Sequence, residues 1–188
     1  MAQATVLTET DVKKVCAVIA ARSHAARNRA AFLLSVLAGM RVGEIAKLTV
    51  GDVLNADGSI AREIKLTAEQ TKGNKGRTVF LSERLQRELA AYVKTLPRTQ
   101  PSLPLIYSQR GHKRFSNITL CMLFKRIYEL AGIRNSSHAG RRTFATRLNA
   151  KGVGMRTIQK LMGHRHIGTT ALYCDVSDET MRKAVCLV

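Results

Sequence analysis

The chain has 188 residues, and its 31 Lys and Arg residues outnumber its 13 Asp and Glu residues to give a formal net charge of +18. Its apolar fraction of 45% is ordinary for a folded domain, so the charge does not come from a disordered basic tail. No apolar stretch reaches about 18 residues and none lies near the start, so no membrane-spanning helix and no secretion signal are expected. With 3 prolines and 13 glycines, the chain is neither collagen-like nor of low complexity.

The hydrophobic pattern predicts an α+β fold that is mainly helical. Apolar residues recur at helical spacing, with Thr or Ser at several starts and Gly at several ends. The predicted helices cover residues 8–22, 25–38, 42–48, 83–96, 116–131, 138–151, 155–163 and a last one that begins near 168. Alternating residues predict strands over 59–67 and 78–81, and we expect a small three-stranded antiparallel sheet. No linker divides these elements, so residues 1–188 are expected to form one domain, with its core at about 8–180.

The cysteines form no C-x-x-C pair, and they are expected to be reduced and mostly buried thiols. They are Cys16, Cys121, Cys174 and Cys186. Cys16 lies on the apolar face of a predicted helix and is expected in the core. His164 and His166 near Cys174 suggest zinc, but no second ligand pair follows at the usual spacing. We therefore expect no metal.

A folded domain with this charge indicates an acidic partner. Nucleic acid is the leading candidate because neutralised phosphates release counterions, and a ribosomal-type or merely soluble basic protein is the alternative. Aromatic residues make up 5% of the chain, without Trp, which is unlike a single-strand binder built on stacked rings. We therefore expect contacts to the phosphates of duplex DNA.

One stretch of the sequence holds a group of candidate catalytic residues. His138 and Arg141 are three residues apart on a predicted helix and therefore share a face. The pair Gly163-His164 follows further along the chain, and Tyr173 comes nine residues after His164. A single H-x-x-R motif is a weak signal, whereas several such positions in a fixed order are a strong one.

Two upstream residues complete the group, Arg41 in the segment G-M-R-V-G-E and Lys72 in a glycine-rich turn. In this order the residues resemble the signature of the tyrosine recombinases, the phage-integrase and Xer class. The six signature residues are Arg41, Lys72, His138, Arg141, His164 and Tyr173. The resemblance covers residues 8–180 and implies the fold of the DNA breaking-rejoining enzymes, a helical catalytic domain with a small sheet at one side.

The residue types suit phosphodiester cleavage independently of the resemblance. A tyrosine can attack phosphorus and form a covalent ester, which makes Tyr173 the expected nucleophile. Two guanidinium groups, those of Arg41 and Arg141, can bind the phosphoryl oxygens on which negative charge develops. Glu44 is expected to orient a neighbour by a salt bridge. Because the bond energy is kept in the protein–DNA ester, we expect no ATP, other cofactor or metal.

The remaining roles are those that the resemblance implies. Lys72 is the general acid that protonates the departing 5′ oxygen, although Lys75 lies in the same turn and Lys65 on the preceding strand, and the choice between Lys72 and Lys75 stays open. His138 is an acid or base near the nucleophile. His164 donates a hydrogen bond to the phosphoryl group.

The resemblance implies a site-specific DNA recombinase that works through a 3′-phosphotyrosyl link in DNA integration, excision or inversion. Its partners would be a duplex recombination site, further copies of itself in a tetramer on DNA, and an accessory DNA-bending protein. It would act on cytoplasmic, nucleoid-associated DNA, or on host DNA if a virus or mobile element encodes it. The alternatives are a type IB topoisomerase-like relaxase and a DNA-binding or architectural module without catalysis, against which the six filled positions argue.

Basic residues outside the signature are candidate DNA contacts, with a solvated surface as the alternative. The expected contacts are Lys75, Arg110, Lys113, Arg114 and Arg142. An earlier basic patch holds Arg22, Arg27 and Arg29. The sequence does not locate any residue that reads bases.

Three features depart from the usual family pattern. Gly140 stands where many members have Leu before the second Arg of the signature, which lowers helix propensity. Arg41 comes too early for the helical core-binding domain that most members carry, so we expect either a minimal recombinase without that domain or a fragment. The apolar tail, residues 174–188, is expected to pack on a neighbouring protomer, and docking on its own core is the alternative.

Overall fold

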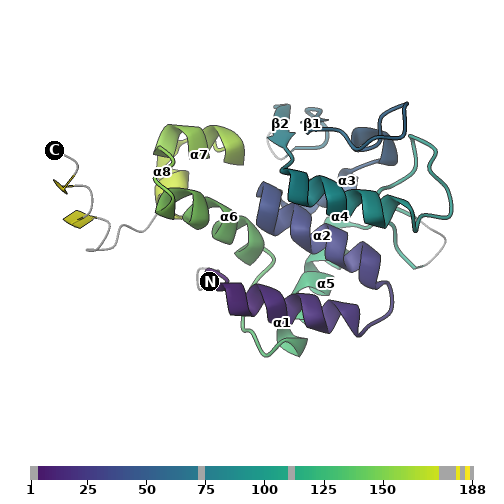
Figure 1. Cartoon of the computed structure of the whole chain (residues 1–188), viewed down its shortest axis with the longest axis horizontal. Coiled ribbons are helices and arrows are strands. Elements are labelled where there is room, and N and C mark those ends of the chain that lie inside the picture. Colours follow the sequence, from purple (N-terminus) through teal and green to yellow (C-terminus); the bar gives the residue numbers. More distant parts are fainter. Residues whose placement is uncertain (1–3, 72–74, 110–112, 174–180, 183–184, 187–188) are drawn as a thin grey trace.

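The computed structural model describes residues 4–71, 75–109, 113–173, 181–182 and 185–186. It confirms a mainly helical α+β fold with a small sheet beside a helical body (Figure 1). The described elements are α1 (Glu9–Ala20), α2 (Ala25–Ala38), α3 (Val42–Lys47), a 3₁₀ turn (Val50–Asp52), β1 (Glu63–Leu66), β2 (Arg77–Phe80), α4 (Glu83–Val93), α5 (Asn117–Leu130), α6 (Ala139–Ala150), α7 (Met155–Met162) and α8 (Ile167–Ala171). None of the helices that these residues form has the length and apolar content needed to cross a membrane.

The core is built around α2, which is apolar on almost every side. Phe32, Leu33, Leu34 and Val36 are each at most 1% exposed, as expected for a helix covered all round. The covering helices α1, α4 and α6 pack against it, and α5 packs against α1 and α3 (Figure 1). Cys16, expected in the core, is only partly buried and packs at its edge.

Local sequence signals set the helix ends. Thr8 begins α1 with a capping box, because its hydroxyl accepts from the N–H of Asp11 and its own N–H donates to the Asp11 carboxylate, at 3.0 Å each. Ser82 and Ser116 cap α4 and α5 in the same way with their hydroxyl oxygens. Gly39 ends α2 in the left-handed conformation, with φ 61°. These caps confirm the predicted starts and this predicted stop.

The sheet of the described residues has two strands, not the three that were expected. β1 and β2 pair antiparallel, with Leu66 opposite Arg77. A third pairing, between Leu54 and Ile60, is an isolated bridge around a tight turn. The strand expected over 59–67 is therefore confined to its second half.

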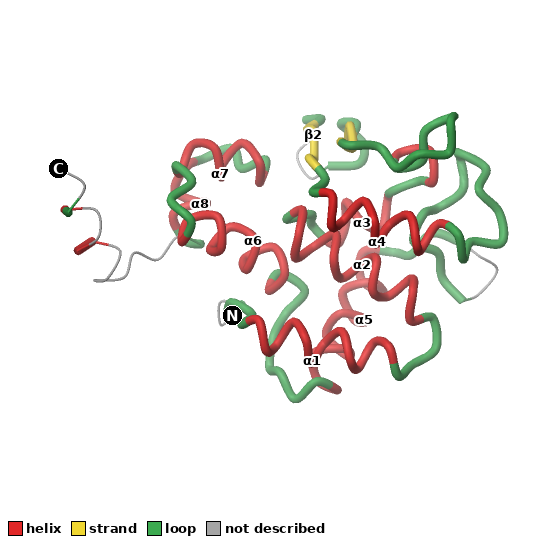
Figure 2. Tube along the Cα trace, in the orientation of Figure 1, coloured by secondary structure: helices red, strands yellow, loops and turns green. Residues whose placement is uncertain are grey.

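A second, small apolar cluster joins α6 to α7. Ala145, Ile158 and Met162 are fully buried in it, and α8 packs against α7. These three helices lie together beside the main helical body (Figures 1 and 2). β2 contacts α7, so the sheet and the α6–α8 group meet where α7 ends.

Candidate active site

Arg41 lies where the chain leaves α2 and enters α3. A side chain at Gly39 would collide with Phe144, whose Cδ1 would lie 2.5 Å from an added Cβ, so glycine permits the close approach of the two segments. Arg41 then starts α3, and its N–H and its Nη1 each donate to Glu44 at 2.8 Å. Its Nη2 donates to the carbonyl oxygen of Gly163 at 3.3 Å. The guanidinium is thereby held over the end of α7.

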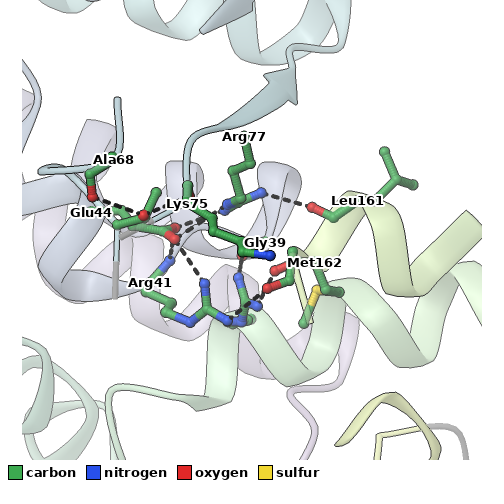
Figure 3. Close-up of polar contacts among 11 residues, drawn as sticks. Gly39, Arg41, Glu44, Ala68, Lys75, Arg77, Leu161 and Met162 are labelled. Atoms are coloured by element: carbon green, nitrogen blue, oxygen red, sulfur yellow. Dashed lines mark hydrogen bonds and ion pairs between the residues drawn. The ribbon is translucent and has the colours of Figure 1, made fainter. Parts of the chain in front are cut away.

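Glu44 is the buried centre of a group of cations. Its side chain is 1% exposed, and its carboxylate accepts hydrogen bonds from both Arg41 and Arg77 (Figure 3). Burial raises the pKa of Glu44, but the hydrogen bonds and charge of Arg77, followed by the charge of Arg141, outweigh burial and hold the pKa below its usual value. The salt bridge expected for Glu44 is confirmed.

Arg77 joins the sheet to the end of α7, and it was not among the predicted site residues. Its side chain is 8% exposed, and its Nη1 donates to the carbonyl oxygen of Leu161 at 2.7 Å (Figure 3). A Cβ on Gly163 would lie 2.5 Å from the Cδ of Arg77. Strand alternation could have identified it, since Arg77 shares a face with the buried Val79 and a buried cation requires a partner.

Arg141 reaches the same region from α6. It is 2% exposed, and its two terminal nitrogens donate to the carbonyl oxygens of Gly39 and Met162. Burial, followed by the charge of Arg41, lowers the pKa of Arg141 to about 9. That value is still above neutral pH, so the guanidinium remains charged. Arg41 and Arg141 thus place two cations beside the end of α7.

His164 and Tyr173 stack just beyond α7. Their ring centroids lie 5.5 Å apart, with 24° between the ring planes. The backbone of Tyr173 is fixed by two hydrogen bonds, from its N–H to the carbonyl oxygen of Thr170 at 2.9 Å and from the Thr146 hydroxyl to its own carbonyl oxygen at 2.6 Å. The Nδ1 of His164 lies 2.9 Å from the Thr170 hydroxyl. Hydrogen bonds to Thr146 and Thr170 therefore hold the two residues in place.

The charges of this region act directly on His164. Burial, followed by the positive charges of Arg141, Arg41 and Arg77, lowers the pKa of His164 to about 4. The imidazole is therefore neutral at neutral pH. Arg41 and Arg141 donate to the carbonyl oxygens of Gly163 and Met162. These two residues directly precede His164, so Arg41, Arg141 and His164 lie in one site. Tyr173 stacks at its edge.

His138 lies at the start of α6, beside the cleft that Arg41 lines. It is exposed and comes one turn before Arg141. With Arg41, Arg114 and Cys121 it lines a cleft of about 550 Å³. The cleft gives a ligand from solution access to both Arg41 and His138.

Of the three candidate lysines, Lys72 lies outside the described residues. The side chain of Lys65 is 80% exposed on β1. Lys75 is also exposed, and its carbonyl oxygen accepts from the Thr71 hydroxyl at 2.7 Å, which closes the turn. In the view of Figure 3, the Lys75 side chain extends from this turn in the direction of Gly39.

The expected DNA contacts lie in different surroundings. Lys113 and Arg114 are exposed, and Arg114 lines the cleft. Arg142 is only 8% exposed, and its guanidinium lies 5.7 Å from the ring centroid of Tyr173, within cation–π range. Arg110 lies outside the described residues. Arg142 therefore lies beside the candidate nucleophile, and its contact with DNA stays a prediction.

The chain is similar in sequence to known proteins. A family model described as "Phage integrase family" matches residues 5–180. Over 180 residues the chain is 33% identical to a protein named tyrosine recombinase XerA from Pyrococcus horikoshii, an alignment that covers 95% of this chain and 59% of that protein. The chain therefore spans well under two thirds of the length of this relative.

Solved structures share the architecture. The crystal structure of XerA recombinase matches with a TM-score of 0.75 at 24% identity, over 97% of this chain and 63% of that one. The pre-cleavage complex of the XerH site-specific recombinase bound to difH substrate matches with a TM-score of 0.68 at 25% identity, over 96% of this chain and 53% of that one. The helical body with its lateral sheet is thus a fold that these recombinase structures contain.

Proposed function

Because the chain belongs to the phage integrase family, we propose that it is a site-specific DNA recombinase, which cuts and rejoins DNA strands through a covalent 3′-phosphotyrosyl intermediate. The observation that supports this most is the stacked His164–Tyr173 pair beside the cations Arg41 and Arg141. Phosphodiester exchange needs a nucleophile, charge stabilisation and proton transfer. We assign the first two roles to Tyr173 and to the pair Arg41 and Arg141, and the proton transfers to His138 and to Lys72 or Lys75.

In the proposed cleavage step, the phenolic oxygen of Tyr173 attacks the scissile phosphorus. A new P–O bond forms to Tyr173 as the bond to the 5′ oxygen breaks. The phenolic proton passes to His138 as a general base, and the departing oxygen takes a proton from Lys72 or Lys75. The product is a 3′-phosphotyrosyl ester and a free 5′-hydroxyl.

The negative charge that develops on the phosphoryl oxygens is met by Arg41 and Arg141. Each guanidinium has five N–H donors, so the hydrogen bonds to protein oxygens leave donors for the phosphate. Those protein bonds fix both groups before DNA binds, which lowers the reorganisation that the reaction requires. Neutral His164 has one ring N–H. We assign that proton to Nε2, which donates a hydrogen bond to the phosphate, while Nδ1 accepts from the Thr170 hydroxyl 2.9 Å away.

Religation is the same reaction in reverse, with a 5′-hydroxyl as the nucleophile and Tyr173 as the leaving group. The ester conserves the bond energy, so neither step consumes ATP. Exchange between two duplexes requires four active sites, and we therefore propose a tetramer on duplex recombination sites, with an accessory DNA-bending protein as a further partner. The protein would act in the compartment that holds its target DNA.

The proposed function is tested by trapping the covalent intermediate on DNA whose sequence is left open around the cleavage point. A library of nicked duplexes with random sequence around the nick is incubated with the protein, and protein-linked DNA is recovered under denaturing conditions and sequenced. The proposal expects enrichment of one sequence, and no linked DNA with Tyr173→Phe. A wild-type protein that binds duplex DNA yet never links to any member of the library would contradict it.

A further inference from the structure

The candidate nucleophile, Tyr173, follows a short helix that buries little of its own surface. α8 (Ile167–Ala171) has 5 residues, too few for a helix that is stable by itself. Its buried side chain is that of Thr170, whereas Ile167 and Leu172 are 46% and 56% exposed. The position of Tyr173 therefore depends on contacts from other elements.

Two residues on one face of α6 supply such contacts. Arg142 and Thr146 are four residues apart, about one turn of helix, and so share a face. The guanidinium of Arg142 lies 5.7 Å from the ring centroid of Tyr173, within cation–π range. The Thr146 hydroxyl donates to the Tyr173 carbonyl oxygen at 2.6 Å. One residue thus contacts the side chain of Tyr173, and the other binds its backbone.

The burial of Arg142 favours an internal role for this cation. Arg142 is 8% exposed, whereas Lys113 and Arg114 are exposed. A cation on an aromatic ring is held more strongly where water is excluded. Arg142 therefore presents little surface to a ligand from solution, while its contact with the ring of Tyr173 is largely shielded.

The same helix carries residues to which the proposed mechanism gives other roles. His138 directly precedes the first residue of α6, and Arg141 is the neighbour of Arg142. The side chain of Arg141 is fixed by its own hydrogen bonds, to the carbonyl oxygens of Gly39 and Met162. One rigid helix can therefore set the nucleophile relative to the phosphate-binding cation. Reacting groups that are placed before they meet have a lower entropic barrier to reaction.

We propose that Arg142 and Thr146 are positioning residues for the nucleophile. From one face of α6, Arg142 holds the ring of Tyr173 and Thr146 holds its backbone, so that the phenolic oxygen is in place when the scissile phosphate binds Arg141. The proposal rests on the proposed function and deepens it. In this role Arg142 acts through Tyr173 and not through a phosphate.

The proposal is tested by the rate of adduct formation in a single turnover, on a nicked duplex that carries the sequence enriched from the library. At saturating protein this rate does not depend on affinity. Arg142→Gln should slow it by about 3- to 30-fold, with unchanged duplex affinity. The matched control is Arg147→Gln, because Arg147 lies on the same helix, is 29% exposed and pairs with Glu9 at 2.9 Å. The control should keep the wild-type rate.

Salt dependence distinguishes this role from a contact between Arg142 and DNA. If Arg142 binds a phosphate, Arg142→Gln should weaken duplex binding and lower the slope of log K against log salt by about 1. If Arg142 positions Tyr173, the slope should equal that of the wild type. A lowered slope, or a wild-type rate of adduct formation at saturation, would overturn the positioning role.

Two further variants keep the proposal testable if Arg142→Gln folds poorly. Thr146→Val leaves every charge in place and should slow adduct formation by about 2- to 10-fold. Arg142→Lys keeps a cation near the ring and should be faster than Arg142→Gln. Each rate is measured well below the melting temperature of its variant, so that unfolding does not contribute. A wild-type rate in Thr146→Val, or equal rates in the two Arg142 variants, would contradict the proposal.

The two proposals fail in different ways. If the wild type forms the covalent adduct while Arg142→Gln and Thr146→Val form it at the same rate, the positioning proposal is wrong and the recombinase proposal stands. If the wild type binds duplex DNA but links to no member of the library, the recombinase proposal itself is wrong.

Discussion

The guanidinium of Arg77 binds both carboxylate oxygens of Glu44, with Nε 3.2 Å from Oε1 and Nη2 2.7 Å from Oε2. The two side chains are 8% and 1% exposed, so the ion pair is buried. Glu44 also binds Arg41, and Arg77 also binds the carbonyl oxygen of Leu161. One ion pair therefore connects α3, the sheet and the end of α7, where the side chains of Arg41 and Arg141 also bind.

Breaking this ion pair on one side should destabilise the fold strongly. In Arg77→Met the Glu44 carboxylate stays buried but loses the two hydrogen bonds and the positive charge of Arg77. We therefore expect the free energy of unfolding to fall by about 3–5 kcal/mol. Adding Glu44→Leu should recover part of the loss, so that a double-mutant cycle gives a coupling of about 1–3 kcal/mol. Urea unfolding of the four proteins measures it. Purely additive effects would contradict a direct contact.

Gly163→Ala and Gly152→Ala separate backbone strain from crowding. Both glycines have positive φ, 61° and 79°, and alanine in this region costs about 1–2 kcal/mol. An added Cβ meets nothing within 4 Å at Gly152 but lies 2.5 Å from the Cδ of Arg77 at Gly163. Gly163→Ala should therefore lower the melting temperature more than Gly152→Ala, and it alone should reduce adduct yield. Equal effects would show that Arg77 does not pack against Gly163.

Gly140→Ala tests why this chain has glycine before Arg141. Helix propensity alone predicts a gain of about 1 kcal/mol. A Cβ at this buried position would lie 2.6 Å from the Ser35 hydroxyl and 3.1 Å from the Cγ2 of Val36, so we expect a loss of about 1–3 kcal/mol instead. Ser35→Ala should reduce that loss when the two changes are combined. A stabilised Gly140→Ala protein in urea unfolding would refute the packing explanation.

The lowered pKa of His164 should make the fold sensitive to acid. The folded pKa is about 4 against a usual value of 6.5, so between these values the unfolded chain binds a proton that the folded protein does not. Stability should therefore be full above pH 6.5 and fall as the pH drops toward 4. The fall from pH 7 to pH 5, measured by urea unfolding, should be smaller in His164→Gln. The same fall in both proteins would contradict burial of His164 beside three arginines.

The sequence identified most of the elements because their signals are local. Caps such as Thr8 and the stop at Gly39 depend on neighbouring residues alone, so they could be read without the fold. The meeting of Arg41, Arg141, His164 and Tyr173 could not be derived from spacing. It was expected only from the family resemblance, and the structure brings these four together.

Other features depend on contacts between distant segments, which a pattern does not contain. The contact between Arg142 on α6 and the ring of Tyr173 depends on the path of the chain after α7. The DNA contact expected for Arg142 stays a prediction. Arg77 and Glu44 are far apart in sequence and meet only through tertiary packing. The expected third strand is absent from the described residues because the chain makes a tight turn between Leu54 and Ile60. Only an isolated bridge forms there, although the residues that follow alternate as in a strand.

The most direct test of the recombinase proposal is to identify the residue that carries the DNA. Wild-type protein is incubated with a nicked duplex that carries the sequence enriched from the library. The covalent protein–DNA adduct is then digested with a protease, and the peptide linked to DNA is sequenced by mass spectrometry. We predict a 3′-phosphate on Tyr173, no adduct in Tyr173→Phe, and equal duplex affinity in both proteins. An adduct on another residue, or one that persists in Tyr173→Phe, would contradict the proposal.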